Sequence, residues 1–217
     1  MKACVLIPAY NESANILKLI QDIKKYQLEV LVIDDGSTDN TFSIAKDAGV
    51  QAMLNLNNQG KGASLVKGFK YALENNFDAV ITMDADGQHL AEDLPFFIEQ
   101  ANDPNTHIIL GNRMFNVEKM PYLRVLTNKF MSWLISNISK QVIPDTQCGF
   151  RLIKKEVFKN VKLNTSKFDA ESELLIKASR LGFKIKSIPI RSIYGREKSQ
   201  INPFVDTLRF IKLIFKN

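Results

Sequence analysis

Short apolar runs alternate with amphipathic stretches along most of this chain. The run at residues 3–7 is apolar throughout, which is typical of a strand buried on both faces of a parallel sheet. Comparable runs recur at intervals further along. We predict strands at residues 3–7, 29–33, 50–54, 78–83, 107–110 and 183–190.

The stretches between these runs have helical periodicity. Apolar residues recur every three or four positions from Ile16 to Ile23, which predicts a helix over residues 13–26. Asn11 or Ser13 is a candidate N-cap for it. We predict further helices at residues 38–48, 62–73, 92–101, 121–139 and 168–181. Strands that alternate with helices indicate an α/β fold with a mostly parallel central sheet and helices on both of its faces.

Polar clusters follow three of the predicted strands at their carboxyl ends. They are the segments Pro-Ala-Tyr-Asn-Glu at 8–12, Asp-Asp-Gly-Ser-Thr-Asp at 34–39 and Asp-Ala-Asp-Gly-Gln-His at 84–89. Parallel sheets bind ligands in the crevice beyond the carboxyl ends of their strands. We therefore expect the three clusters to share one crevice.

Two aspartates, Asp84 and Asp86, are separated by a single residue at the end of the strand 78–83. Side chains two apart on an extended backbone point the same way, so both carboxylates and the oxygen of Gln88 can converge on one cation. Carboxylate and amide oxygens suit Mg²⁺ or Mn²⁺. The same residue types also form Asp-rich turns before helices, and the spacing alone leaves both interpretations open.

The composition is that of one globular domain. A chain of 217 residues with 45% hydrophobic content can fill one core. The net charge of +6 permits an anionic substrate or a membrane surface, and it does not require nucleic acid as a partner. Cys4 and Cys148 form neither a disulfide framework nor a metal-ligand spacing, which fits a reducing cytoplasm.

The sequence shows no secretory signal, and no apolar run approaches the roughly 18 residues that a membrane-spanning helix needs. We therefore expect a soluble or peripheral protein. Residues 203–217 are predicted to form an amphipathic helix with Phe204, Leu208, Ile211 and Phe215 on one face. Such a basic helix can lie in a membrane interface or pack on the domain, and the pattern fits both.

Further short segments join the three polar clusters in a fixed order. They are Gly60-Lys61-Gly62 and the segments at residues 111–113, 148–151 and 194–199. Together with the clusters, they resemble the inverting glycosyltransferases of family 2, most closely the dolichyl-phosphate mannose synthases and related polyprenyl-phosphate glycosyltransferases. The resemblance implies a GT-A (Rossmann-like) fold, a nucleotide-sugar donor and a divalent metal, Mg²⁺ or Mn²⁺.

On the nucleoside side, the resemblance implies a pocket lined by Pro8, Tyr10 and Glu12. Asp35 would contact the base or the ribose, and Asp34 competes with it for this role. An ordinary turn would also explain the first three residues. Capping of the following helix would also explain the two aspartates.

On the diphosphate side, the resemblance implies that Asp84 faces the ribose and the metal. The implied metal ligands are Asp84, Asp86 and Gln88. The metal held by Asp86 would stabilise the departing diphosphate. Arg196 and Lys198, on the loop after the last predicted strand, would close over the diphosphate, and Lys61 is a third candidate. A solvated basic loop would also explain Arg196 and Lys198.

On the acceptor side, Arg113, Arg124 and Asn128 resemble residues that bind the acceptor phosphate in the dolichyl-phosphate branch. A surface ion pair or a charged helix face would also explain them. Glu171 falls where many family-2 enzymes have a catalytic aspartate, although the residues around it differ. It would be the general base for a hydroxyl acceptor, and would only orient groups for a lipid phosphate acceptor. Glu173 is expected to be structural.

The function that these considerations favour is transfer of a sugar, with inversion, from a UDP- or GDP-linked donor to a polyprenyl phosphate of the dolichyl or undecaprenyl type. Residues 1–202 would form the catalytic domain. The protein would be peripheral to the cytoplasmic face of a membrane, held there by residues 203–217 or by a separate membrane subunit. The alternatives are a saccharide or other hydroxyl acceptor, with Glu171 as base, and a non-catalytic module that binds nucleotide sugars.

Overall fold

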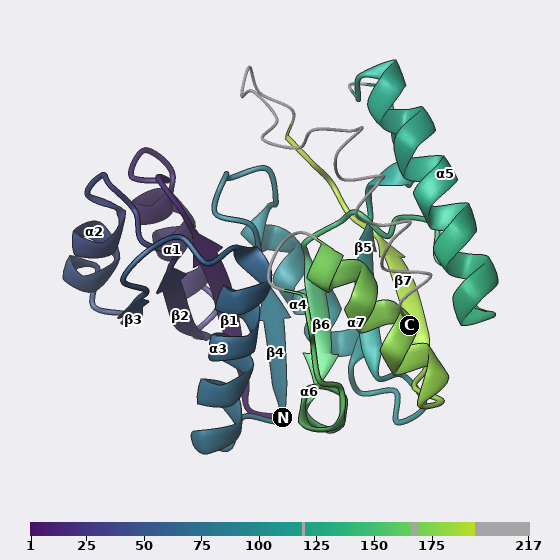
Figure 1. The fold of residues 1–217 in the computed structure, drawn as a ribbon. Helices are drawn as coiled ribbons and strands as arrows, with labels where there is room; N and C mark the ends of the chain where they lie inside the picture. The colour runs from purple at the N-terminus through teal and green to yellow at the C-terminus, as the bar shows by residue number, and fades with distance from the viewer. Residues whose placement is uncertain (119, 166–168, 194–217) are drawn as a thin grey trace.

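Seven strands form one sheet in a computed structural model that describes residues 1–118, 120–165 and 169–193 (Figure 1). The order across the sheet is β3-β2-β1-β4-β6-β5-β7. The strands are β1 (Ala3–Ala9), β2 (Glu29–Asp34), β3 (Gln51–Leu54), β4 (Ala79–Thr82), β5 (Ile108–Asn112), β6 (Arg151–Lys154) and β7 (Ile185–Pro189). The predictions for Arg196, Lys198 and the helix at 203–217 lie outside the described residues.

The sheet is parallel except at β6. This strand runs antiparallel between β4 and β5, with Arg151 opposite Thr82 and Leu110. The predicted α/β fold with a mostly parallel sheet is confirmed, but no strand was predicted here. The apolar run is short and Arg151 interrupts it, so the pattern carries no clear strand signal. Because β6 is reversed, its first residue lies at the same edge as the carboxyl ends of β4 and β5.

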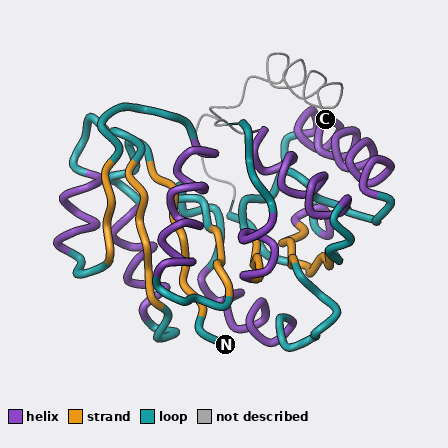
Figure 2. The backbone as a smooth tube through the Cα atoms, turned by 60° about the horizontal axis from the view of Figure 1, so that its bottom comes forward, coloured by secondary structure: helices purple, strands orange, loops and turns teal. Residues whose placement is uncertain are grey.

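Helices cover both faces of the sheet (Figures 1 and 2). Alternate side chains of β1 point to opposite faces, so Val5 and Ile7 belong to one core cluster and Cys4 and Leu6 to the other. The first cluster takes residues from α1, α2 and α4, and the second from α3, α5, α6 and α7. The helices are α1 (Ile16–Lys24), α2 (Thr41–Asp47), α3 (Lys61–Glu74), α4 (Leu94–Gln100), α5 (Tyr122–Ser139), α6 (Lys155–Asn160) and α7 (Asp169–Arg180), with short 3-10 turns at η1 (Ala91–Asp93) and η2 (Arg113–Phe115).

The first helix begins later than predicted. Its cap position is Asn15, so the predicted N-caps Asn11 and Ser13 are wrong. Asn11 instead adopts a left-handed backbone with φ of 55°, a conformation that asparagine tolerates better than most residues. The chain between β1 and α1 is therefore a loop held above the sheet.

Across the described residues, no helix is both long enough and apolar enough to cross a membrane.

Candidate active site

The loops after β1 and β2 are joined by hydrogen bonds. The side-chain oxygen of Asn11 accepts from Thr38 N at 2.8 Å, and Asn11 N donates to Ser37 Oγ at 2.9 Å. Glu12 N donates to Thr41 Oγ1 at 2.8 Å. Because the bonds run in both directions between the two loops, they form one platform at the carboxyl edge of the sheet.

The predicted nucleoside residues lie on this platform. Pro8, Tyr10 and Glu12 are each half-buried at the end of β1. Asp34 is fully buried; one of its oxygens accepts from Ser37 N at 2.7 Å, and the other has no hydrogen-bond partner among the described residues. The structure thus brings the predicted residues together, while their contact with a nucleoside stays a prediction.

Asp35 accepts hydrogen bonds from the segment between β3 and α3. It is 4% exposed, and its Oδ1 accepts from Asn55 Nδ2 at 2.8 Å and from Gln59 N at 3.0 Å. Its Oδ2 accepts from Gly60 N at 2.7 Å. The carboxylate therefore fixes the loop before α3, because the donors of that loop need a buried acceptor. Contact of Asp35 with the base or the ribose stays a prediction.

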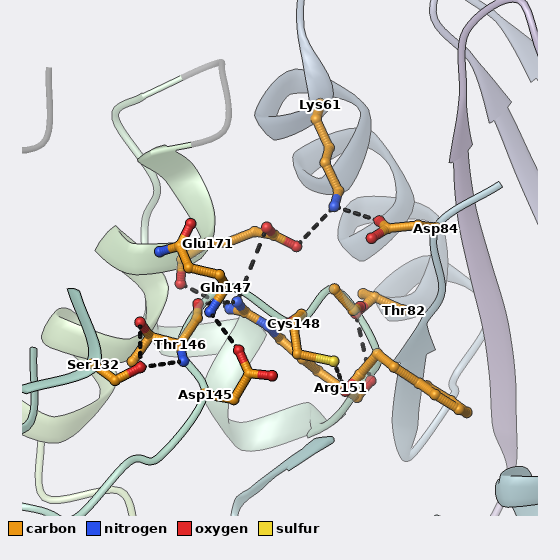
Figure 3. A network of polar contacts seen from close by, with 12 residues as sticks. Lys61, Thr82, Asp84, Ser132, Asp145, Thr146, Gln147, Cys148, Arg151 and Glu171 are labelled. Carbon is orange, nitrogen blue, oxygen red and sulfur yellow. Dashed lines mark hydrogen bonds and ion pairs between the residues drawn. The ribbon is translucent and has the colours of Figure 1, made fainter. Parts of the chain in front are cut away.

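A lysine joins two acidic residues from distant parts of the chain. Lys61, at the start of α3, forms ion pairs with Asp84 after β4 and with Glu171 on α7, the second at 3.0 Å (Figure 3). Its side chain is only 14% exposed. Lys61 was predicted to contact the donor, and the structure places it between Asp84, a predicted metal ligand, and Glu171, a predicted catalytic residue.

Burial and neighbouring charges shift the pKa values of Asp84 and Lys61 in opposite directions. Burial alone would raise the pKa of Asp84, but the Lys61 charge and a hydrogen bond from His89 outweigh it and hold the pKa well below its usual range. Burial would likewise lower the pKa of Lys61, but Asp84 and Glu171 outweigh it and raise the pKa. Both groups are therefore charged at neutral pH.

Arg151 holds the second side of the network. This residue is 1% exposed, and its guanidinium donates to the carbonyl oxygens of Cys148, Glu171 and Thr146 at 2.7, 2.8 and 2.9 Å. It also lies 3.9 Å from the Glu171 carboxylate. Arg151 therefore ties the loop before β6 to the start of α7 (Figure 3). The sequence placed this residue in a family segment but gave it no role.

Gly149 allows Asp84 to approach this loop. A Cβ atom on Gly149 would lie 2.4 and 2.5 Å from the two oxygens of the Asp84 carboxylate, which is closer than real contacts allow. His89 lies on the same carboxylate, with Nε2 at 3.5 Å, and its ring packs on Phe150. The His89 side chain is 2% exposed, so it is part of the packing around this loop.

The two aspartates do not lie on an extended backbone as predicted. β4 ends at Thr82, and the chain turns at Ala85 and Asp86, with φ of 71° at Gly87. Asp86 Oδ1 accepts from Gln88 N at 2.9 Å, so the loop is closed by its own side chain. The argument from strand alternation is wrong because the strand stops before the first aspartate.

The oxygen atoms that this loop offers as ligands still fit a divalent metal. Asp84, Asp86 and Gln88 offer two carboxylates and an amide oxygen within five residues, which are the ligand types that Mg²⁺ and Mn²⁺ accept. No group of three or more His, Cys, Asp and Glu side chains able to hold a metal occurs in the part of the chain that the structure describes. The metal ligands therefore stay a prediction.

The predicted acceptor residues are less open than expected. Arg113 is 4% exposed and donates through Nε and a terminal nitrogen to the two oxygens of Asp145, at 2.8 and 2.9 Å. A buried guanidinium needs such a partner. Asn128 is also 4% exposed, on the inner face of α5, and Arg124 one turn earlier is half-buried. Arg113 is therefore no surface clamp in this conformation, and phosphate binding by the three residues stays a prediction.

The chain that follows β7 lies against the acidic loop. Ile193 N donates to the carbonyl oxygen of Gln88 at 3.0 Å, and Ser192 pairs with His89 in an isolated antiparallel bridge. A pocket of about 200 Å³ lies between this loop and α1, and Asp86, Gln88 and Ile193 are among its lining residues. The described chain thus ends beside the predicted metal ligands.

The arrangement is that of a GT-A nucleotide-sugar fold. The structure is similar to that of glucosyl-3-phosphoglycerate synthase from Mycobacterium tuberculosis, crystallised with Mn²⁺, uridine diphosphate and glucosyl-3-phosphoglycerate. The TM-score is 0.75 at 18% identity, over 99% of this chain and 79% of that one. At this identity the similarity shows the fold alone.

The sequence comparison then defines the family. Residues 4–162 match the model of glycosyl transferase family 2. The chain therefore belongs to this family of glycosyltransferases.

Relatives in the family share most of this chain. It is 28% identical to a UDP-N-acetylglucosamine–dolichyl-phosphate N-acetylglucosaminyltransferase of Methanococcus voltae, over 88% of this chain and 85% of that protein. It is 33% identical to a dolichol-phosphate mannosyltransferase of Pyrococcus furiosus, over 82% of this chain and 53% of that protein.

Proposed function

We propose that this glycosyltransferase transfers a sugar, with inversion, from a UDP- or GDP-linked donor to a polyprenyl phosphate. The observation that carries the proposal is the ion-pair network of Lys61, Asp84 and Glu171 at the carboxyl edge of the sheet, where α/β folds bind their ligands. The acceptor class rests on the relatives, which are named for transfer to dolichyl phosphate.

In this proposal the platform after β1 and β2 binds the nucleoside through Pro8, Tyr10 and Glu12. Lys61 offers a cation to the diphosphate from the first turn of α3. A divalent metal would be held by Asp84, Asp86 and Gln88, and when bound it acts as a Lewis acid on the departing diphosphate. Arg196 and Lys198 are proposed to add further positive charge there.

When the acceptor is a phosphate, its attacking oxygen is already negatively charged, so no proton has to be removed from the acceptor. An oxygen of the polyprenyl phosphate forms a bond to the anomeric carbon from the face opposite the donor. The bond from that carbon to the diphosphate oxygen breaks, and its electron pair leaves with the nucleoside diphosphate. Arg113, Arg124 and Asn128 are proposed to hold the acceptor phosphate, and Glu171 keeps Lys61 and Arg151 in place.

A hydroxyl acceptor would change the role of Glu171. The hydroxyl proton must then be removed, and Glu171 is proposed to accept it. This alternative rests on the 8% exposure of Glu171 and on its contact with Lys61. We further propose that the protein is peripheral to the cytoplasmic face of a membrane, through residues 203–217 or a separate subunit.

A donor screen tests the proposal directly. Purified protein is given a panel of UDP- and GDP-sugars with Mg²⁺ or Mn²⁺, with and without a short-chain polyprenyl phosphate. The expected result is a sugar-lipid product whose formation requires the lipid phosphate. Donor turnover that is indifferent to the lipid would contradict the acceptor and favour a hydroxyl, and Glu171→Gln would then abolish it.

The metal assignment has its own test. Asp86→Ala should lower turnover about a thousandfold or more, as expected when a group that stabilises the departing charge is lost. Asp47→Ala, an exposed aspartate on α2, is the matched control and should leave turnover unchanged. Isothermal titration of Mn²⁺ in the presence of the nucleoside diphosphate provides a second readout. Unchanged metal binding by the Asp86 variant would remove it from the ligands.

A further inference from the structure

A lysine ammonium group contacts one of the carboxylates that are proposed to bind the metal. Lys61 Nζ is paired with Asp84 Oδ1 (Figure 3). Asp84 Oδ2 lies 3.5 Å from His89 Nε2, so both oxygens of this carboxylate have a neighbour. Two cations that share one carboxylate repel each other strongly, because the distance between them is short. A metal that takes Asp84 as a ligand therefore competes with Lys61 for it.

In this competition the side chain of Lys61 is the group that can move. The backbone at the start of α3 is fixed, because the Asp35 carboxylate accepts from Gly60 N at 2.7 Å. Asp84 is confined on its other side by its close approach to Gly149. A lysine ammonium is a compact charge on a flexible stem. The ammonium can therefore change its partner while the elements around it keep their positions.

Lys61 has a second acidic partner on a different element. Its Nζ lies 3.0 Å from Glu171 Oε1 on α7. This oxygen is buried and otherwise has no hydrogen-bond partner among the described residues. A buried charge needs a partner of opposite sign, and Glu171 provides one that does not belong to the proposed metal ligands. Lys61 can therefore leave Asp84 without losing every negative neighbour.

The charges of these three side chains indicate what releases Lys61 from Asp84. One ammonium and two carboxylates leave a net charge of −1. A divalent cation on Asp84 leaves the ammonium with one carboxylate fewer. A nucleoside diphosphate brings phosphate oxygens, which a lysine ammonium binds well. The metal and the diphosphate together satisfy both Asp84 and Lys61, whereas either ligand alone leaves one of the two without its partner.

We propose that Lys61 competes with the divalent metal for Asp84, and that a nucleoside diphosphate ends this competition by accepting Lys61. When the metal and the diphosphate bind together, the ammonium passes from Asp84 to the diphosphate, and Glu171 stays beside it. Lys61 thereby makes metal binding depend on the nucleotide. The inference rests on the proposed function for its two ligands, and it concerns their binding and not the transfer of the sugar.

The first test measures the binding of Mn²⁺ alone to the full-length protein, from the electron paramagnetic resonance signal of the unbound ion. Lys61→Met should bind Mn²⁺ about tenfold more tightly than the wild type, a typical size for coupling between two ligands. Lys70→Met is the matched control, because it removes a charge from the same helix whose pair with Glu74 is exposed. It should bind Mn²⁺ as the wild type does. Equal binding by the wild type and Lys61→Met would overturn the proposal.

A second variant separates competition from a simple change of net charge. Lys61→Met makes the site more negative, which by itself attracts Mn²⁺. Lys61→Met combined with Glu171→Gln keeps the net charge of −1. Competition predicts that this double variant still binds Mn²⁺ more tightly than the wild type, because Asp84 has lost the ammonium. Wild-type affinity would overturn the proposal. The double variant leaves only Asp84 without its partner, so it also serves if the single variant does not fold.

Calorimetric titrations with UDP and GDP, each with Mn²⁺ and with EDTA, test the role of the nucleotide. The ratio of the two affinities measures the coupling between metal and nucleotide. We expect this ratio to be about tenfold larger in the wild type than in Lys61→Met, and an equal ratio would overturn the proposal. No lipid is present in these titrations. A donor screen without any sugar-lipid product would instead contradict the proposed function and leave the competition at Asp84 standing.

Discussion

The carboxylates on the two sides of the crevice are stabilised by different kinds of partner. On the side formed by the loops after β1 and β2, Asp35 accepts from the main-chain N–H groups of Gln59 and Gly60. On the side formed by β4, β6 and α7, Asp84 and Asp145 are paired with the side chains of Lys61 and Arg113. The first side relies largely on uncharged hydrogen-bond donors, and the second depends on charged side chains.

This difference has an energetic consequence. A typical hydrogen bond contributes about 0.5–1.5 kcal/mol to stability, so a lost bond between the two loops has a modest effect. Removal of one partner of a buried charged group costs about 3–5 kcal/mol, because the remaining charge is left in the interior. Single substitutions should therefore be most damaging on the side held by ion pairs.

The largest effect is expected from Arg151→Met. The substitution keeps much of the apolar volume but leaves three buried carbonyl oxygens without their donor and removes a positive charge 3.9 Å from the Glu171 carboxylate. We expect the free energy of unfolding to fall by about 3–5 kcal/mol in urea titrations. Arg191→Met is the control, because its pair with Glu92 is exposed and should be worth less than about 1 kcal/mol. Equal losses in both variants would refute the contrast.

Gly149→Ala should damage activity more than stability. The added methyl group would collide with the Asp84 carboxylate and displace it. A misplacement of about 1 Å in an active site can lower turnover about a hundredfold, which corresponds to about 2.7 kcal/mol. Steady-state kinetics and urea unfolding of the same variant separate the two effects. Wild-type turnover would show that the position of Asp84 is unimportant.

The ion pair between Asp145 and Arg113 should make the free energy of unfolding fall at low pH. Burial alone would raise the pKa of Asp145, but Arg113 outweighs it and holds the pKa below its ordinary value of 3.8. The stability from this pair is therefore present above about pH 4 and is lost as the pH falls through the lowered pKa, by at most about 1.4 kcal/mol per pH unit. Asp145→Asn should show a shallower loss in urea titrations from pH 5 to pH 2. An unchanged slope would contradict the assignment.

The smallest effect is expected on the hydrogen-bonded side. Asn11→Gly keeps the left-handed backbone but removes the acceptor for Thr38, so we expect a loss of about 1 kcal/mol. Asn11→Ala should cost more, because alanine also disfavours a φ of 55°. Thermal or urea unfolding measures both. If the glycine variant lost more stability than the alanine variant, backbone strain at position 11 would not explain the extra cost expected for alanine.

The features that the sequence predicted are those with a local pattern. Apolar runs marked six of the seven strands, and the polar clusters at their carboxyl ends marked where the crevice lies. Asp84 was singled out from its spacing to Asp86, and Lys61 and Glu171 from a resemblance; the structure joins the three through Lys61. Their roles in binding and transfer are still predictions.

The features that the sequence did not reveal depend on distant partners. Arg151 interrupts an apolar run and reads as a surface residue until the carbonyl groups around it are known. Gly149 matters only because Asp84, 65 positions earlier, approaches it. Asp35 accepts from Gln59 N and Gly60 N in the loop before α3, and no spacing in its own segment predicts these partners.

The reversed strand β6 also sets an order for chain synthesis. β4 and β5 do not pair with each other, and each pairs with β6, which begins only at Arg151. While a ribosome is still adding residues 113–150, the β3-β2-β1-β4 part of the sheet therefore ends at β4, whose edge away from β1 has no partner strand. Open strand edges are templates for aggregation. Residues 151–154 close that edge, so delayed synthesis of this short segment should expose the nascent protein to aggregation for longer.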